Sequence, residues 1–290
     1  MSKKIIVIAG SLLVIAGVSA YWLFRVPAVP DTPLPVSTEA IARGEYLVYA
    51  GGCISCHAGT VDGDSLSGGH PVVTAFGTFY APNISPDPAT GIGGWTGREF
   101  LLALRHGRRP GGGYYFPVFP FRSYAGLSDQ DVLDIGAYLM SCPPVSHVVP
   151  AHDKAGWLSA WMMAGWNLIA DLQGQETAVP ADPVLARGAY LVRHLGHCGE
   201  CHTPRNRLGI PEQGRDLAGG EVDGKEVEPI DAAALADWSE EDLVLLLLLG
   251  LKPDGEYVGG AMADVVEHNT SHLDAGDQAA IAAYLKREQK

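Results

Sequence analysis

An internal repeat divides this chain and limits its fold, because a sequence that states one pattern twice should build one structural unit twice. The stretch "ARGEYLVYAGGCISCHAG" from Ala42 returns as "ARGAYLVRHLGHCGECHTP" from Ala186. "WTGREFLLALRHGRRPGG" returns from Trp238 as "WSEEDLVLLLLLGLKPDG", and "LSDQDVLDIGAYLM" returns from Leu273 as "LDAGDQAAIAAYLK". Each copy predicts a helix, a CxxCH motif, a long loop, a second helix, another loop and a last helix.

Helix-start signals support these helices. Asp182 and Pro183 give an N-cap followed by proline at the first helical position, where its missing N–H costs nothing. Thr96 and Ser239 each begin an apolar run with an acidic residue three positions later, which is the capping-box spacing. The loops are long and rich in Gly and Pro, which is unusual in a compact domain unless something else fills the core. A large apolar cofactor would fill it.

The two CxxCH motifs predict two covalently bound heme c groups. Two thiols one helical turn apart can reach the two vinyl groups of one porphyrin, and the adjacent imidazole is then aimed at the iron. A zinc site, a thioredoxin-like dithiol and structural disulfides are weaker readings, because the gap between the pairs is long, the flanks are helical and CxxC closes a very short loop. The attachment residues are Cys53, Cys56, Cys198 and Cys201, and the proximal ligands are His57 and His202.

The second axial ligands differ between the two copies. Met262 is the only methionine after the second CxxCH motif and follows two glycines, so we expect its sulfur to bind the second iron. The repeat offset of 143 that relates Trp95 to Trp238 carries Met262 onto Phe119, which cannot bind iron. The first iron either takes another ligand, with His106 and His70 as candidates, or leaves that position open.

The N-terminus predicts export. Residues 5–24 carry no charge and are about as many as a membrane-spanning helix needs. They follow Lys3 and Lys4, which places the N-terminus in the cytoplasm and the heme domains in the periplasm, held by a single-pass anchor in the cytoplasmic membrane. The alternative is a cleaved signal peptide, because Val18, Ser19 and Ala20 resemble a cleavage site.

The expected architecture is all-α, with two tandem heme-binding domains after the N-terminal transmembrane helix. Residues 1–25 form the anchor or signal segment and residues 26–37 a Pro-rich spacer. The first domain covers residues 38–142 and the second residues 181–290. Residues 143–180 link them and hold Trp and Met residues at helical spacing between Trp157 and Ile169, which predicts a connector helix or, alternatively, a membrane-surface helix.

Four stretches, "GGCISCH", "FGTFYAPNISPDPATGIGGW", "GHCGECHTPRN" and "GGAMADVV", resemble the multiheme cytochrome c subunits of bacterial membrane-associated dehydrogenases. The resemblance implies class I cytochrome c domains that accept electrons from a periplasmic or membrane dehydrogenase and pass them to a quinone, a cytochrome or an oxidase. Three features depart from the family: two heme motifs instead of three, an N-terminal anchor, and "FPVFPF" in place of "YPAMPY" around Phe119. The net charge of −13 excludes a nucleic-acid partner.

A redox enzyme is the alternative function, similar to diheme thiosulfate dehydrogenases or peroxidases. It would use an open or labile first heme, and Arg105, Arg108 and Arg109 beside that heme could bind an anion. The same arginines could instead form a solvated face or pair with heme propionates.

Overall fold

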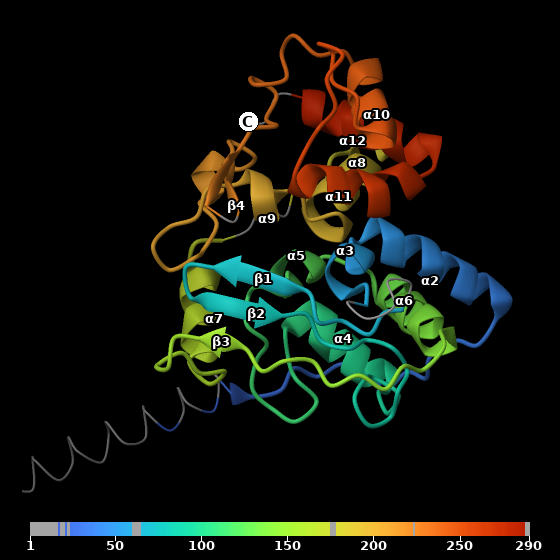
Figure 1. Cartoon of the computed structure of the whole chain (residues 1–290), viewed down its shortest axis with the longest axis vertical. Coiled ribbons are helices and arrows are strands. Elements are labelled where there is room, and N and C mark those ends of the chain that lie inside the picture. The colour runs from blue at the N-terminus through green and yellow to red at the C-terminus, as the bar shows by residue number, and fades with distance from the viewer. Residues whose placement is uncertain are drawn as a thin grey trace, which may run out of the picture.

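Figure 1 shows the computed structural model, which describes residues 24–59, 65–174, 178–222 and 224–287 together with Gly17 and Tyr21. Two halves are stacked along the long axis of the molecule. The first half contains α2 (Thr38–Ala50), α3 (Cys53–His57), α4 (Gly97–His106), α5 (Phe121–Tyr124) and α6 (Asp129–Ser141). The second repeats this order with α8 (Pro183–Tyr190), a π-helical turn (Leu191–Leu195), α9 (Gly199–His202), α10 (Glu240–Leu249), α11 (Ala261–His268) and α12 (Ala275–Lys286).

The predicted helix starts are confirmed. Thr96 and Ser239 both form complete capping boxes, with Glu99 and Asp242 as the reciprocal partners. Asp182 caps α8 by accepting hydrogen bonds from two backbone N–H groups, and Pro183 is its first residue. These local hydrogen bonds satisfy N–H groups that a helix cannot pair internally.

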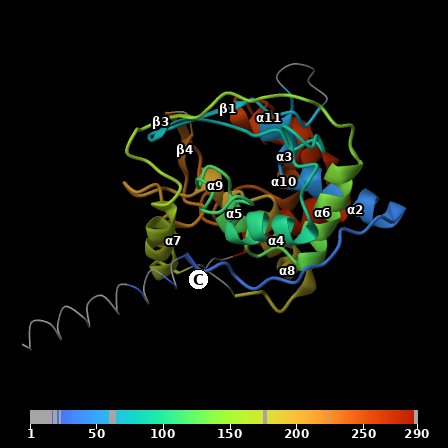
Figure 2. The same ribbon diagram turned by 90° about the horizontal axis from the view of Figure 1, so that it is seen from below.

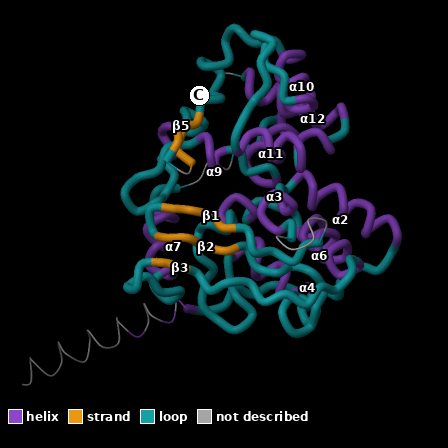
Figure 3. Tube along the Cα trace, in the orientation of Figure 1, coloured by secondary structure: helices purple, strands orange, loops and turns teal. Residues whose placement is uncertain are grey.

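The expectation of an all-α fold is wrong, because two small antiparallel sheets form in the long loops. One sheet has the order β1 (Pro71–Thr74), β2 (Gly77–Tyr80), β3 (Asp153–Lys154), and the other pairs β4 (Gly220–Val222) with β5 (Lys225–Val227). Val72 pairs with Phe79, and Gly220 pairs with Val227. Figure 3 shows these strands along one side of the molecule and the longer helices along the other. Short strands pair here because backbone groups in a folded loop need hydrogen-bond partners.

The expected transmembrane helix is not supported. Within the described ranges, no helix is long and apolar enough to cross a membrane. Most of residues 5–24 lie outside the described part; the ring centre of Phe24 lies 5.7 Å from that of Trp161. The Pro-rich segment that follows lies along the first half: Arg108 donates from Nη2 to the carbonyl of Arg25 at 2.7 Å, and Leu34 packs against the core.

The first and last helices of each half cross in close contact, and glycine makes the crossing possible. A Cβ at Gly44 of α2 would lie 1.9 Å from the carbonyl oxygen of Asp134 in α6. A Cβ at Gly188 of α8 would lie 2.1 Å from the carbonyl oxygen of Ala280 in α12. Real side chains do not approach so closely, so both crossings require glycine.

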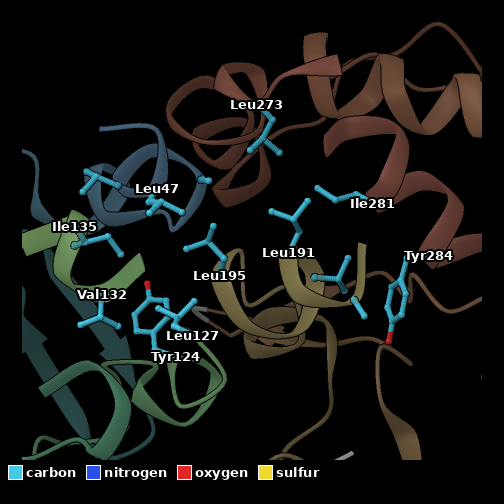
Figure 4. Close-up of a cluster of buried hydrophobic side chains, with 14 of the residues drawn as sticks. Leu47, Tyr124, Leu127, Val132, Ile135, Leu191, Leu195, Leu273, Ile281 and Tyr284 are labelled. Atoms are coloured by element: carbon cyan, nitrogen blue, oxygen red, sulfur yellow. The ribbon is translucent and has the colours of Figure 1, made fainter. Parts of the chain in front are cut away.

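One hydrophobic cluster runs through both halves, as Figure 4 shows. Leu47 and Val132 enter it from the first half, and Leu195 and Ile281 enter it from the second. Two tyrosines tie the halves together reciprocally: Tyr46 of α2 donates to Asp277 of α12 at 2.6 Å, and the hydroxyl of Tyr190 in α8 donates to Asp131 of α6. The halves therefore share a core and polar contacts with approximate two-fold symmetry.

The connector contains α7 (Met163–Leu172), which starts later than the helical spacing of the sequence predicts. Leu158 is buried with Phe79 and Met163 in a second small cluster, so the chain before α7 follows the sheet instead of a helix. Figure 2 shows α7 beside the N-terminal segment, on the side opposite α2 and α6.

Candidate functional site

The first CxxCH motif forms a single helical turn with its histidine held from behind. Cys53 and Cys56 lie three residues apart on α3, which follows Gly52 in the left-handed conformation (φ 68°). The Nδ1 of His57 donates to the carbonyl of Pro82 at 2.8 Å. That bond fixes the tautomer, so Nε2 is left as the nitrogen that can bind a metal.

The second motif has the same arrangement. Cys198 occupies the N-cap position of α9, Cys201 lies one turn later, and Nδ1 of His202 donates to the carbonyl of Glu228 at 2.7 Å. In both halves the oxygen comes from the long loop after the motif, 25 and 26 residues away in sequence. The sequence did not identify these carbonyls, because any residue type can supply one.

Burial keeps both sets of groups neutral. Desolvation raises the pKa of the Cys53 and Cys198 thiols to about 12 in each case. Desolvation also lowers the pKa of His57 and His202, although the carbonyl hydrogen bonds of both oppose the shift. Neutral imidazoles are the form that binds a metal, whereas thiols with a raised pKa do not favour dithiol redox chemistry.

These observations test whether the residues fit heme. In the described residues, no group of three His, Cys, Asp or Glu side chains could hold a metal ion, so the cysteine pairs do not gather into a zinc site. No disulfide joins the five cysteines. Two thiols one turn apart beside an imidazole with its Nε2 available are what covalent heme attachment requires. Each motif therefore fits a covalently bound heme.

The segments that lead into the two motifs touch each other across the interface. His197, the residue before Cys198, is half-buried and has a positive φ of 40°, and its Nε2 lies 3.3 Å from the carbonyl oxygen of Gly51. Its ring makes an edge contact with Tyr124, at 5.4 Å between centres. A further hydrogen bond crosses the interface: the hydroxyl of Ser55 in α3 donates to the side-chain oxygen of Asn269 at 3.0 Å. The two attachment helices thus lie close together, which the sequence could not reveal.

The structure fixes the equivalence between the two ligand loops. Gly107 and Gly250 both end their helices in the left-handed conformation, and a backbone bridge joins Leu251 to Tyr257 as another joins Arg108 to Tyr114. Each of these pairs differs by 143 positions, so the offset holds from the helices into the loops.

Met262 is the second residue of α11 and is half-buried. Phe119 occupies the equivalent position in an aromatic cluster, with ring centres 5.3 Å from Tyr115 and 5.8 Å from Tyr124. Phe119 therefore contributes to packing at the place where the second half presents a thioether.

The two histidines considered for the first iron lie in different settings. His70 is exposed and precedes β1. His106 is in the last turn of α4, where burial, followed by the nearby cations Arg105 and Arg108, lowers its pKa. Its counterpart in the other half, Leu249, faces solvent.

The three arginines considered for anion binding have partners within the protein. Arg105 forms an ion pair with Asp129. Arg108 is buried, bonds the carbonyl of Arg25, and lies 3.8 Å from the ring centre of Tyr114. Arg109 lies over the ring of Tyr115 at 6.0 Å. Two of the three guanidinium groups are thus committed to internal contacts.

Comparison with known proteins agrees with this site. The Cytochrome c family matches residues 41–143. A diheme cytochrome c-type protein of Cereibacter sphaeroides is 46% identical, over 96% of this chain and 95% of the relative. The chain belongs to the cytochrome c family, with the diheme cytochromes c.

Two further relatives are dehydrogenase subunits. The gluconate 2-dehydrogenase cytochrome c subunit of Pantoea cypripedii is 40% identical over 85% of this chain. The cytochrome c subunit of the quinone alcohol dehydrogenase of Gluconobacter oxydans is 37% identical over 85% of this chain. The chain spans 59% and 54% of these two relatives, respectively.

Proposed function

We propose that the protein is a periplasmic diheme electron carrier, which takes single electrons from a dehydrogenase and passes them to the respiratory chain through a quinone, a cytochrome or an oxidase. The observation that carries this proposal is the pair of matching attachment helices, each with its histidine oriented by a carbonyl and both close to the interface between the halves. The names of the dehydrogenase subunits among its relatives support the choice of donor.

Each site residue has a stated role in this proposal. Cys53 and Cys56 hold one porphyrin, and Cys198 and Cys201 hold the other. His57 and His202 are the proximal ligands, and Met262 is the sixth ligand of the second heme. The hemes supply the one-electron chemistry, and the protein sets their potentials through axial ligands, burial and hydrogen bonds.

The direction of transfer follows from the axial ligands. A methionine ligand raises the reduction potential of a heme. If the first heme has two nitrogen ligands, with His106 or His70 as the second, electrons would run from the first heme to the second. A redox titration that gives the first heme the higher potential would reverse this order.

A redox enzyme is the second candidate, and one observation favours it. Phe119 stands where the other half has its methionine, so the first iron could be open to a small substrate such as thiosulfate or peroxide. The partners of Arg105 and Arg108 weigh against an anion site there. The carrier is therefore the function that the geometry supports better.

Low-temperature EPR with near-infrared magnetic circular dichroism on the oxidised protein separates the two. We expect one His/Met low-spin signal in the wild type that disappears in Met262→Ala and persists in Met162→Ala, a control at an exposed methionine of the connector. The other heme should give a bis-nitrogen low-spin signal. A high-spin signal in the wild type that shifts when a small anion is added, together with turnover of thiosulfate or peroxide, would contradict the carrier.

A further inference from the structure

The outer face of α10 is apolar and uncovered. Leu245, Leu248 and Leu249 follow the i, i+3, i+4 spacing that places side chains on one helix face, and they are 40%, 39% and 53% exposed. The inner face of the helix packs through Leu243 and Leu247, which are buried in the shared core. This helix is therefore apolar on both faces, and the described residues cover only one of them.

The repeat shows that the fold does not require this outer face. At the equivalent positions of α4 stand Leu102, Arg105 and His106. Leu102 is buried, and Arg105 is bonded to Asp129 and to the carbonyl of Ala125. At these positions the first half thus has a buried leucine, an internally bonded arginine and a half-buried histidine, whereas the second half has three exposed leucines.

The charges around the two helices also differ. The stretch 237–256 around α10 has one basic residue, Lys252, which pairs with Asp254 and Glu256. The acidic residues in this stretch are Asp237, Glu240, Glu241, Asp242, Asp254 and Glu256. The equivalent stretch 94–113 has one acidic residue, Glu99, against Arg98, Arg105, Arg108 and Arg109. Figure 1 shows α10 and α4 towards opposite ends of the long axis, so these two oppositely charged stretches lie far apart in the molecule.

The apolar face lies next to the elements that hold the second site. Thr270 donates to the carbonyl of Leu247 at 2.6 Å, and a Cβ at Gly250 would contact Val258 and Val266. Val266 belongs to α11, the helix that carries Met262. Tyr257, which is 70% exposed, is paired through its backbone with Leu251, two residues beyond the end of α10, and so adds an exposed aromatic residue near that end of the helix.

We propose that the face formed by Leu245, Leu248, Leu249 and Tyr257 docks a redox protein whose contact surface is apolar at its centre and positively charged at its rim. This proposal rests on the proposed carrier function and adds the place and chemistry of one partner. An apolar centre with a charged rim is a common design of protein interfaces, and complementary charge speeds encounter. An anionic lipid surface would be repelled by the acidic rim, and a second copy that docked through the same face would set acid against acid.

The test uses the heme-loaded protein and a strongly basic mitochondrial cytochrome c as the probe. Binding is measured by calorimetry at about 10 mM and about 100 mM salt, where the Debye length falls from ~30 Å to ~10 Å. We expect Leu245→Ser/Leu248→Ser/Leu249→Ser to weaken binding about tenfold or more at both salt concentrations, as the loss of a central apolar contact does. Glu240→Lys/Glu241→Lys should weaken binding at low salt and flatten its salt dependence.

The matched control is Leu168→Ser/Ile169→Ser/Leu172→Ser on α7, where three apolar side chains are also exposed. It should bind as the wild type does. No wild-type binding at either salt concentration, equal binding of an acidic ferredoxin, unchanged binding of the α10 variants, or an equal loss in the control would overturn the docking proposal. Heme content and reduction by ascorbate are measured for every variant. A protein that holds hemes and exchanges electrons but docks elsewhere refutes only this inference, whereas one without redox-active hemes refutes the carrier itself.

Discussion

Removing the two interface hydroxyls, with Tyr46→Phe and Tyr190→Phe, should loosen the contact between the halves. Tyr46 donates to a carboxylate oxygen of Asp277 at 2.6 Å and accepts a longer hydrogen bond from the backbone N–H of Asp274. Tyr190 makes the reciprocal pair of contacts with Asp131 and Ser128. The change to phenylalanine removes only the oxygen and leaves the ring packed.

The magnitude follows from what each carboxylate retains. A hydrogen bond to a charged group contributes about 1.5–3 kcal/mol to stability. Asp277 keeps two bonds from Arg187, at 2.8 and 2.6 Å, so its charge is not left unpaired. We therefore expect Tyr46→Phe to lower the free energy of unfolding by about 1.5–2 kcal/mol, the lower end of this range, and Tyr190→Phe to lower it by a similar amount. The double variant should lose about 2–4 kcal/mol, up to the sum of the single losses, because Arg187 bonds Asp277 and also lies 5.5 Å from the ring centre of Tyr190, which couples the two contacts.

The assay is urea unfolding of the heme-loaded protein at pH 7, followed by far-ultraviolet circular dichroism. Tyr80→Phe is the control, because Tyr80 is half-buried and its hydroxyl makes no hydrogen bond within the described residues. Burial, and then the bond to Asp277, raises the pKa of Tyr46 above its usual value. Its contribution should therefore be complete below about pH 10 and decline above it. If both single variants unfold within about 0.5 kcal/mol of the wild type, the hydroxyls do not hold the halves together.

Two further predictions concern the second half and the connector. Gly188→Ala should destabilise the protein by about 3 kcal/mol, because its Cβ would overlap the carbonyl oxygen of Ala280. Gly165→Ala has open space around its Cβ and should stabilise α7 by about 1 kcal/mol. Equal melting temperatures of the two variants would contradict this contrast. Burial alone would raise the pKa of Asp277, but hydrogen bonds from Arg187 and Tyr46 lower it overall. The ionised carboxylate of Asp277 therefore stabilises the protein fully above about pH 4, and this stabilisation declines as the pH falls. Asp277→Asn should make the free energy of unfolding depend less on pH in the acid range. An acid dependence equal to that of the wild type would count against a stabilising role for the bonds to Asp277.

Local sequence signals predicted the helices well and the sheets not at all. Capping boxes at Thr96 and Ser239 depend on residues three positions apart, so the sequence contains the whole interaction. The strands have two to four residues each, and β3 joins its sheet from about 75 residues away, next to Gly77 and Thr78. No local pattern encodes such a pairing. The spacing from Trp157 predicted a helix that tertiary packing of Leu158 replaces with turns.

The sequence by itself determined the chemistry of each half. Residue types and spacings reveal the CxxCH motifs and the repeat offset, and they show that Phe119 in the first half stands where the second half has Met262. They suffice because covalent attachment and iron ligation depend on particular side chains. The tertiary structure alone decided how the halves meet. The contact of His197 with Gly51, the reciprocal tyrosine bonds and the uncovered face of α10 join or expose residues that are distant in the chain, and only packing of the shared core brings them into place.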